Sequence, residues 1–573
     1  MNEATIIDVS RIPFSRFGAY VSVTYEKNRG DKHLIIHNVR RRFGEDEAYE
    51  LNFEKNDTKV DYTIVSRPYV MNIHSPAGNA RLYIRDYKSI VIDSDGLDIS
   101  LKQLCKMGYG TQENERQFKL ISQDQKIYTL IYVGKGKALL SGPLYRKKIG
   151  NREFIVDRRQ ELRVKCENEK ALVYFEISPI ESKRPPLPIN VEDEIMEIKK
   201  EWESFLAKMP PVPDHRKNYA EVTWYNLWSS FVRAEDVYKS DIMLMSKKFM
   251  CSVWSWDHCF NALAIAEADL KMGLDQFLAP FELQAETGVL PDYWNPNSEV
   301  VWAVTKPPIH GWCFGKLMEK YNNIPEEILR KVYYGLEKWT DWWLTYRDSD
   351  NDGIPDYPQG CDSGWDNSTL FDIGFFLEAP DLPAYLILQM KTLARIARKI
   401  GYEEKASFWE KKARRLLERL YEHSWVNGRF VAKLSRTHEF EEKPTSLQAV
   451  MPIVLGDILD KDKFDRLVEI LTKDFLTENG PATEAPSSPL YESDGYWRGP
   501  IWAPSTYLIV DGLKRGGRED LAKRIAKSFC DMVQYKAKGN YENFDALTGK
   551  GLRAPGYTWT ASVWMLLVRE YWI

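Results

Sequence analysis

Two carboxylate-bearing motifs, 176 residues apart, are the sequence features best suited to chemistry. The first places Asp366 between a tryptophan and an asparagine, and the second places Glu542 in Tyr541-Glu542-Asn543-Phe544. A carboxyl beside an aromatic ring can stay protonated and act as a general acid, whereas one among polar groups stays ionised and acts as a base. The pair therefore predicts acid–base hydrolysis of a glycosidic bond, with Asp366 and Glu542 as the catalytic residues.

Each motif also has a simpler interpretation when taken alone. Asp366 could be a turn aspartate that caps the following segment, and Glu542 could be a surface glutamate ahead of the Thr548-Gly549 turn. The catalytic hypothesis therefore depends on both motifs and on what surrounds them.

An arginine lies between aromatic residues in the run from Tyr496 to Trp502, which reads Tyr-Trp-Arg-Gly-Pro-Ile-Trp. Sugars present apolar C–H faces and rings of hydroxyls, so aromatic rings beside a planar donor such as Arg498 suit them. The same run could equally be an arginine packed between tryptophans. At Trp256-Asp257, the carboxylate could bind a sugar hydroxyl or cap the next helix.

Five motifs in a fixed order resemble those of glycoside hydrolase family 63 and its relatives. These relatives are processing and bacterial α-glucosidases and mannosylglycerate or glucosylglycerate hydrolases, with trehalases more distant. The resemblance covers roughly residues 250 to 573. The motifs are Trp256-Asp257, Lys306-Pro307-Pro308-Ile309-His310-Gly311-Trp312, the run from Asp362 to Ser368, the run from Tyr496 to Trp502, and Glu542-Asn543-Phe544 with Thr548-Gly549.

The resemblance implies an (α/α)6 barrel that cleaves α-glycosides with inversion, with Asp366 as general acid and Glu542 as general base. Lys306 stands where many relatives have glutamine, so this cation could meet an anionic aglycone or a neighbouring carboxylate. The predicted substrate-binding residues are Trp256, Asp257, Lys306, His310, Gly364, Trp365, Asn367, Tyr496, Trp497, Arg498 and Trp502.

The expected function is that of an exo-acting, inverting hydrolase of an α-glucosidic bond in a small oligosaccharide or glycoside. One alternative is an α-mannosidase or glycosylglycerate hydrolase of the same fold. Another is a glycoside phosphorylase, which would use bound phosphate in place of the base. A non-catalytic carbohydrate-binding protein would need the aromatic residues and the arginine but not both carboxylates. The sequence does not identify the sugar, the linkage, the aglycone or the oligomeric state.

The distribution of tryptophan predicts two domains that a helix connects. All 19 tryptophans lie at or after Trp202, and short alternating apolar runs fill the region before it. We expect a β-sandwich-like domain at 1–190 that ends at Pro185, Pro186 and Pro188, a linker helix at 191–214, and an (α/α)6-barrel catalytic domain at 215–573. The strand-like runs are 19–25, 60–64, 81–85, 126–132 and 171–177.

Helical periodicity marks the region from about residue 215 onward, and long aromatic loops separate the helices. A closed toroid of helix pairs with the loops at one mouth accounts for both features. The predicted helices are 216–235, 257–272, 308–321, 325–347, 380–400, 404–421, 446–458, 463–475, 500–515, 519–536 and 557–570.

The composition is that of an ordinary globular protein, with 44% apolar residues, 28% charged residues and a net charge of −4. It argues against nucleic acid as a partner, and the lack of a membrane-length apolar stretch or a signal peptide predicts a cytoplasmic protein. The seven cysteines are scattered without CxxC pairs, which argues against a disulfide framework or a zinc cluster. No cofactor is expected to be required.

The run from Asp348 to Gly353 has the alternating acids and the glycine of a calcium loop. Gln359 stands where the closing bidentate glutamate would be, so the acids could instead form a polar turn that orients the Asp366 loop. His258 and His310 lack a second ligand at helical spacing, which favours core or substrate-binding roles over metal binding. We therefore expect no metal in the catalytic site and leave open a structural calcium ion.

Overall fold

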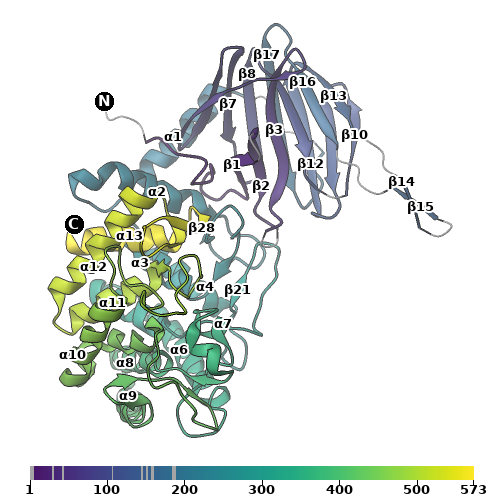
Figure 1. Cartoon of the computed structure of the whole chain (residues 1–573). Helices are drawn as coiled ribbons and strands as arrows, with labels where there is room; N and C mark the ends of the chain where they lie inside the picture. Colours follow the sequence, from purple (N-terminus) through teal and green to yellow (C-terminus); the bar gives the residue numbers. More distant parts are fainter. Residues whose placement is uncertain are drawn as a thin grey trace. The chain divides into compact units, whose positions relative to one another are not determined.

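The computed structural model describes residues 5–28, 31–41, 44–105, 107–142, 146–149, 152–155, 160–183 and 189–573 (Figure 1). Contacts divide the chain into two compact units. Unit 1 comprises residues 1–209, 218–252 and 295–297, and unit 2 comprises residues 210–217, 253–294 and 298–573. The proline cluster that predicted the end of the first domain, Pro185, Pro186 and Pro188, lies outside the described residues.

Unit 1 contains two large sheets in which all neighbouring strands are antiparallel. One sheet has the order β1-β2-β3-β9-β16-β13, with β4 beside β3, and the other has the order β10-β11-β12-β17-β8-β7-β6-β5. The first sheet consists of β1 (Val21–Asn28), β2 (Asp31–Asn38), β3 (Glu47–Lys55), β4 (Thr58–Lys59), β9 (Asp98–Gln103), β13 (Lys137–Ser141) and β16 (Glu161–Lys165). The second consists of β5 (Thr63–Arg67), β6 (Val70–Ser75), β7 (Gly78–Ile84), β8 (Ser89–Asp95), β10 (Gly108–Asn114), β11 (Gln117–Ser122), β12 (Ile127–Lys135) and β17 (Lys170–Ser178). A separate hairpin joins β14 (Arg146–Ile149) to β15 (Arg152–Ile155).

The two sheets pack through their inner faces. Tyr49 on β3 donates a hydrogen bond of 2.6 Å to Thr129 on β12, and its ring meets Phe175 on β17 edge-on at 6.5 Å. The alternating pattern of the strands places one set of side chains in this interior. The predicted N-terminal antiparallel β domain is therefore confirmed.

Unit 1 also includes two helices. The predicted linker helix runs as α1 (Val191–Leu206), and the side chain of Asn190 caps its first turn by accepting a hydrogen bond from the amide of Asp193. Contacts group α1 and most of α2 (Lys217–Ser230) with this unit, together with the strand pair β18 (Phe231–Val232) and β19 (Ile242–Met243). The sequence placed α2 with the helical region.

Unit 2 is built on a closed ring of helical segments. Each segment packs against the next one along the chain, and α13 returns to contact α3. The ring consists of α3 (Asp257–Ala266), α5 (His310–Lys320), α8 (Asp381–Lys399), the 3-10 segment η3 (Leu447–Ile458), α11 (Ala503–Arg515) and α13 (Thr558–Tyr571). Side chains on nearly every face of these segments are buried, as an inner ring requires.

A second set of helices covers the outside of the ring and is amphipathic. It comprises α4 (Leu270–Glu282), α6 (Glu326–Tyr346), α9 (Glu403–Ser424), α10 (Lys461–Ile470) and α12 (Glu519–Asp531), which pack on α3, α8, α8, η3 and α11 respectively. The short π-helical segment Leu471–Phe475 extends α10, and the π-helical segment Met532–Ala537 extends α12. Inner and outer helices thus alternate along the chain, which confirms the predicted (α/α)6 barrel.

The loops that lead into the inner helices contain short ordered elements. They are β20 (Val253–Trp254) paired with β21 (Tyr293–Trp294), α7 (Gly360–Ser363), η2 (Thr369–Ile373), β22 (Leu377–Glu378) paired with β25 (Lys433–Leu434), β23 (Trp425–Val426) paired with β24 (Arg429–Phe430), and the sheet β26 (Ile501–Trp502), β27 (Tyr541–Phe544) and β28 (Gly551–Pro555). Among the described residues, no helix combines the length and the apolar character that crossing a membrane would require.

Candidate active site

The predicted site residues all lie in unit 2, and most of them lie in loops that end at the start of an inner helix. Because an outer helix separates successive inner helices, the inner helices run in the same direction and their N-termini meet at one end of the ring. Trp256-Asp257 lie at the start of α3, Asp366 in the loop before α8, and Glu542 in the loop before α13.

The loop that carries Asp366 is closed at its base by backbone hydrogen bonds between Tyr357 and Leu377, of 2.9 and 2.8 Å. Within it, Gly364 adopts a left-handed φ of 73° and packs so closely on Trp256 that an added Cβ would lie 2.8 Å from the indole ring. Only glycine meets both requirements without strain. This contact joins the Asp366 loop to the start of α3.

Asp366 faces a buried lysine. The Nζ atom of Lys306 lies 3.5 Å from Oδ1 of Asp366 and 3.3 Å from Oδ1 of Asp292, and it donates a 2.9 Å hydrogen bond to the carbonyl oxygen of Cys361. Burial lowers the pKa of Lys306, but the two carboxylates outweigh burial and hold the pKa above its ordinary value. Of the two partners that the sequence allowed for Lys306, the structure shows the neighbouring carboxylates.

Glu542 is 5% exposed and lies on β27. Its Oε1 accepts a 3.1 Å hydrogen bond from the Tyr496 hydroxyl, and its Oε2 lies 3.5 Å from the amide nitrogen of Ala554. Burial raises the pKa of Glu542 to about 7, and the charge of Asp366 adds to the rise, while the two hydrogen bonds oppose it. The two carboxyls therefore lie within electrostatic reach of one another.

The environments of the two carboxyls differ in a way that the sequence did not predict. Trp365 was expected to keep Asp366 protonated, yet Asp366 has a cation beside it, and burial raises the pKa of Glu542, the expected base, to about 7. The assignment of acid and base roles then depends on where the substrate oxygen and the water lie.

A cluster of tryptophans supports these loops. Trp497 stacks on Trp502 with ring centroids 3.9 Å apart and an interplanar angle of 6°, and it lies 4.7 Å from Trp365 and 6.1 Å from Trp256. All four rings are at most 2% exposed. The fold thus brings the predicted aromatic residues together. Trp502 stacks on Trp497 and also contacts Trp559 edge-on.

The side chain of Arg498 forms its hydrogen bonds with other residues of the protein. Its Nε donates a 2.8 Å hydrogen bond to the carbonyl oxygen of Asn367, and its Nη2 pairs with Asp372. The side chain of Asn367 also accepts a 2.9 Å hydrogen bond from the amide of Trp497 and donates one of 3.0 Å to the carbonyl of Gly495. These contacts connect the Asp366 loop to the loop that contains Tyr496.

Asp257 and His310 are both buried. Asp257 is buried in the first turn of α3, 3.3 Å from the hydroxyl of Tyr557, and burial raises its pKa well above the ordinary value. His310 lies within hydrogen-bond distance of the carbonyl oxygen of Ser255 (3.2 Å) and contacts Phe281 edge-on. Burial lowers the pKa of His310 to about 3, so the ring is neutral and the structure places it in the core.

Sequence reasoning missed two polar residues of the site, Asp292 and Tyr557. Burial raises the pKa of Asp292, which shares Lys306 with Asp366. Tyr557, one residue before α13, is the hydrogen-bond partner of Asp257. Both residues stand in short aromatic runs like those of the predicted motifs, namely Pro291-Asp292-Tyr293-Trp294 and Tyr557-Thr558-Trp559. This pattern could have identified them.

In the predicted calcium loop, the carboxylates accept hydrogen bonds from backbone amides. Asp348 accepts 3.1 Å hydrogen bonds from the amides of Asp352 and Gly353, and Asp350 accepts one of 2.8 Å from the amide of Arg436. Gln359 precedes α7 and supplies no side-chain cap. A calcium ion here stays a prediction. In the described part of the chain, the groups of histidine, cysteine and acidic side chains close enough to share an ion involve this loop and not Asp366 or Glu542.

A cavity of about 670 Å³ lies elsewhere in unit 2, and residues of α5, α8, α9, η3 and α11 line it. Trp312, Lys316, Arg395 and Arg515 are among its lining residues, and neither Asp366 nor Glu542 lines it. A cavity on its own does not identify the site of chemistry. The paired carboxylates identify the end of the ring that carries them as the candidate active site.

Solved structures share this fold. The GH63 mannosylglycerate hydrolase from Thermus thermophilus, in complex with glucose, is 18% identical with a TM-score of 0.52 and covers 62% of this chain and 99% of its own. A bacterial glucoamylase complexed with acarbose is 10% identical with a TM-score of 0.63 and covers 100% of this chain and 95% of its own. The fold is that of the (α/α)6 glycoside hydrolases with an N-terminal β domain.

Sequence comparison identifies the family. Residues 250–560 match the model of the mannosylglycerate hydrolase MGH1-like glycoside hydrolase domain. Mannosylglycerate hydrolase MGH1 of Selaginella moellendorffii is 22% identical in an alignment of 388 residues, and the match covers 54% of this chain and 78% of that protein. The chain belongs to this family of MGH1-like glycoside hydrolases, which is related to family 63, and the predicted resemblance is confirmed.

Proposed function

We propose that the protein hydrolyses the α-glycosidic bond of a small glycosylglycerate with inversion of configuration, using Asp366 as general acid and Glu542 as general base. The observation that carries the proposal is the position of these two carboxyls in loops before inner helices, in a chain with the family's fold, with Lys306 3.5 Å from Asp366. The sequence predicted an α-glucosidase, and the substrate test below distinguishes that activity from hydrolysis of a glycosylglycerate.

The proposed chemistry needs one proton and one water molecule. Asp366 donates its proton to the bridging oxygen as the bond from that oxygen to the anomeric carbon breaks. Glu542 takes a proton from a water molecule that attacks the anomeric carbon from the opposite face. The sugar leaves with inverted configuration, and the aglycone leaves as an alcohol.

The relatives support a glycerate aglycone. Relatives with this domain are named mannosylglycerate hydrolases, and one Thermus structure of the same fold was solved with Tris and D-glycerate. In this chain Lys306 contacts the residue that would protonate the bridging oxygen, so its charge lies close to the aglycone. Asp292 and Asp366 already pair with this cation, so the support for a glycerate aglycone comes from the relatives.

The deciding experiment compares purified protein with its Asp366→Asn variant on a panel of glycosides. The panel contains α-mannosylglycerate, α-glucosylglycerate, nitrophenyl α-glucoside, nitrophenyl α-mannoside, maltose and trehalose, each with and without inorganic phosphate. We expect the highest kcat/KM on a glycosylglycerate, with no dependence on phosphate. A preference for the uncharged glucosides would favour an α-glucosidase, and a requirement for phosphate would favour a phosphorylase. No turnover above the variant on any substrate would contradict the proposal.

A further inference from the structure

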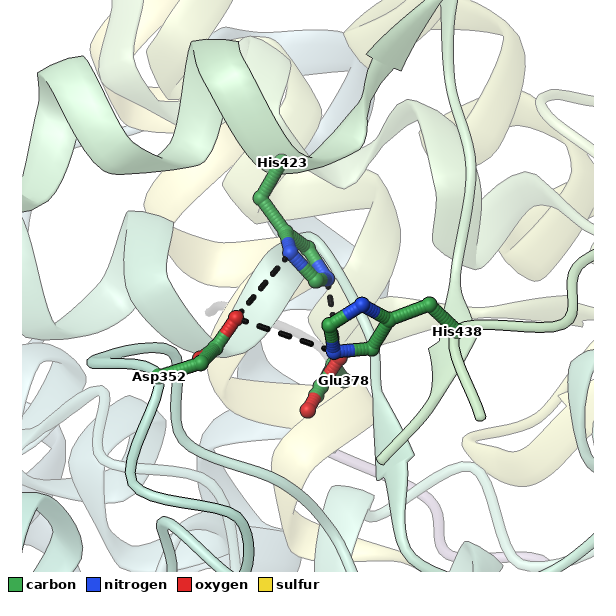
Figure 2. A group of neighbouring side chains, drawn as sticks. All are labelled: Asp352, Glu378, His423 and His438. Carbon is green, nitrogen blue, oxygen red and sulfur yellow. Dashed lines mark ion pairs between the residues drawn. The ribbon is translucent and has the colours of Figure 1, made fainter. Parts of the chain in front are cut away.

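We propose that Asp352, Glu378, His423 and His438 form a binding site for a divalent transition-metal ion, best suited to Zn²⁺, at the base of the loop that carries Asp366. Figure 2 shows the four side chains pointing toward one another from four separate segments of unit 2. Asp352 lies in the loop after α6, Glu378 on β22, His423 in the last turn of α9, and His438 after β25.

The distances bring one candidate ligand atom from each residue into a single cluster. The Nε2 atom of His423 lies 2.8 Å from Oε2 of Glu378, and its Nδ1 lies 3.3 Å from Oδ2 of Asp352. The Nε2 atom of His438 lies 3.9 Å from the same Asp352 oxygen, and all four ligand atoms lie within 4.8 Å of one another. Zinc bonds of about 2.0 to 2.1 Å place tetrahedral ligands roughly 3.3 Å apart, so shifts of about 1 Å complete the site.

Glu378 supplies an independent sign of a missing ligand. Its side chain is 0% exposed, its Oε2 lies 2.8 Å from Nε2 of His423, and its Oε1 has no hydrogen-bond partner among the described residues. A buried carboxylate costs free energy unless it is paired or coordinates a metal, and it faces the two histidines here.

The ligand set distinguishes zinc from calcium. Two imidazole nitrogens with two carboxylate oxygens suit Zn²⁺, whereas Ca²⁺ takes six to eight oxygen ligands. The neighbouring loop acids Asp348 and Asp350 accept hydrogen bonds from backbone amides and do not belong to the group of four clustered ligands. The two carboxylate charges of Asp352 and Glu378 balance those of one divalent ion.

The surroundings hold these ligands in place. The Nη2 atom of Arg419 donates a 2.8 Å hydrogen bond to the carbonyl oxygen of Asp352 and lies 3.5 Å from its Oδ2, while Oδ2 of Asp350 lies 3.1 Å from Nε2 of His438. The contacts of Arg419 orient Asp352 as a metal ligand. Asp350 contacts the same His438 nitrogen that would bind the ion, so this contact would open when the metal binds. The side chain of His438 is 42% exposed, which gives the ion a route from solvent.

The position of the cluster gives it a structural role. Glu378 directly follows Leu377, whose backbone pairs with Tyr357 to close the loop that carries Asp366. An ion bound here would tie that closure to the C-terminal end of α9 and to the segment after β25. It would stabilise the geometry of the Asp366 loop from a distance and take no part in the reaction.

The test measures Zn²⁺ binding to chelator-treated full-length protein by equilibrium dialysis with elemental analysis, and it records the Tm with and without the metal. We expect one Zn²⁺ per chain, a Tm higher by several degrees with the metal, and a dissociation constant at least about tenfold larger in His438→Ala and in Glu378→Gln. Co²⁺ in place of Zn²⁺ should give the strong visible absorption of four-coordinate Co²⁺ in the wild type and lose it in His438→Ala.

Matched controls separate this site from the calcium loop and from surface histidines. Asp348→Asn removes the charge of a loop residue that is not one of the four ligands and keeps the side-chain oxygen that accepts from the amide of Asp352, and His74→Ala removes an exposed histidine of unit 1; both should bind Zn²⁺ as the wild type does. Metal-free Glu378→Gln should be at least as stable as metal-free wild type, because it removes a buried charge, and it should gain nothing from zinc. If Glu378→Gln fails to fold, the exposed His438→Ala still decides. Equal zinc binding by His438→Ala and wild type, or stabilisation by Ca²⁺ but not by Zn²⁺, would overturn the proposal.

Discussion

The hydroxyl of Tyr496 donates a hydrogen bond of 3.1 Å to Oε1 of Glu542. Tyr496 has a left-handed φ of 64°, a conformation that costs on the order of 1 kcal/mol for a residue with a side chain. Its ring packs edge-on against Trp502 at 4.9 Å, which helps to hold the strained backbone in place. The aromatic loop thus positions the carboxyl that we propose as the base.

Replacing Tyr496 by phenylalanine should shift the pH dependence of activity. The hydrogen bond from Tyr496 lowers the pKa of Glu542, so its loss should raise that pKa above the wild-type value of about 7. Because a base must be ionised, the acid-side limb of the kcat/KM profile should move to higher pH. Tyr491→Phe is the control, since the Tyr491 hydroxyl has no hydrogen-bond partner among the described residues. An unmoved limb would mean that Glu542 does not set it.

Asp366→Asn and Glu542→Gln should each lower kcat by about 10² to 10⁴-fold, because each removes one proton transfer and keeps the shape of the side chain. Steady-state kinetics on the best substrate of the panel measures the loss. Glu492→Gln, an exposed carboxyl in the loop before Tyr496, should keep wild-type activity. A loss of less than about tenfold in either variant would remove that residue from its proposed role.

The first product released from an α-glycoside should be the β-anomer. Inversion follows if water attacks directly with Glu542 as base and no covalent intermediate forms. Proton NMR of the early reaction, before mutarotation, distinguishes the anomers. Initial formation of the α-anomer would indicate retention and would exclude this mechanism.

The stability of Glu542→Gln relative to wild type should depend on pH. A carboxyl whose pKa rises from 4.5 to about 7 on folding stabilises the fold most below pH 4.5 and loses that contribution as the pH rises through about 7. The neutral variant escapes the cost of a buried charge, so it should be more stable than wild type at pH 8 by on the order of 1 to 3 kcal/mol. The difference should vanish near pH 4. Melting temperatures of both proteins across this range measure it, and a constant difference would contradict the assignment.

Arg498→Lys and Asp372→Asn should lower kcat/KM by similar factors, of about tenfold. Arg498→Lys removes the Nε hydrogen bond to the carbonyl of Asn367, and both changes weaken the ion pair of Arg498 with Asp372 in the Asp366 loop. If Arg498 acts only through this loop, the double variant should lose little more than either single variant. If Arg498 instead binds the sugar and the contact with Asp372 is incidental, Asp372→Asn should leave kcat/KM unchanged.

Hydrophobic periodicity located most helices of the barrel, because an amphipathic or fully apolar face is a local property of the chain. It did not separate α3 from α4, where Asp269 caps a new helix inside the segment predicted as 257–272. It also began α11 too early, because Ile501 and Trp502 form a strand that pairs with Phe544 and Asn543. The strand partners lie more than 40 residues away, and local periodicity does not report them.

The amino-acid sequence specified which chemical groups the site contains, because the motifs that carry Asp366, Glu542 and the aromatic residues are contiguous in the chain. The contacts and the charges of these groups depend on the folded structure. Lys306 pairs with Asp292 and Asp366, Arg498 binds the loop of Asn367, and His310 is enclosed as a neutral ring. The pKa of a carboxyl depends on burial and on charges brought close by folding, and for Glu542 these come from segments up to 176 residues away.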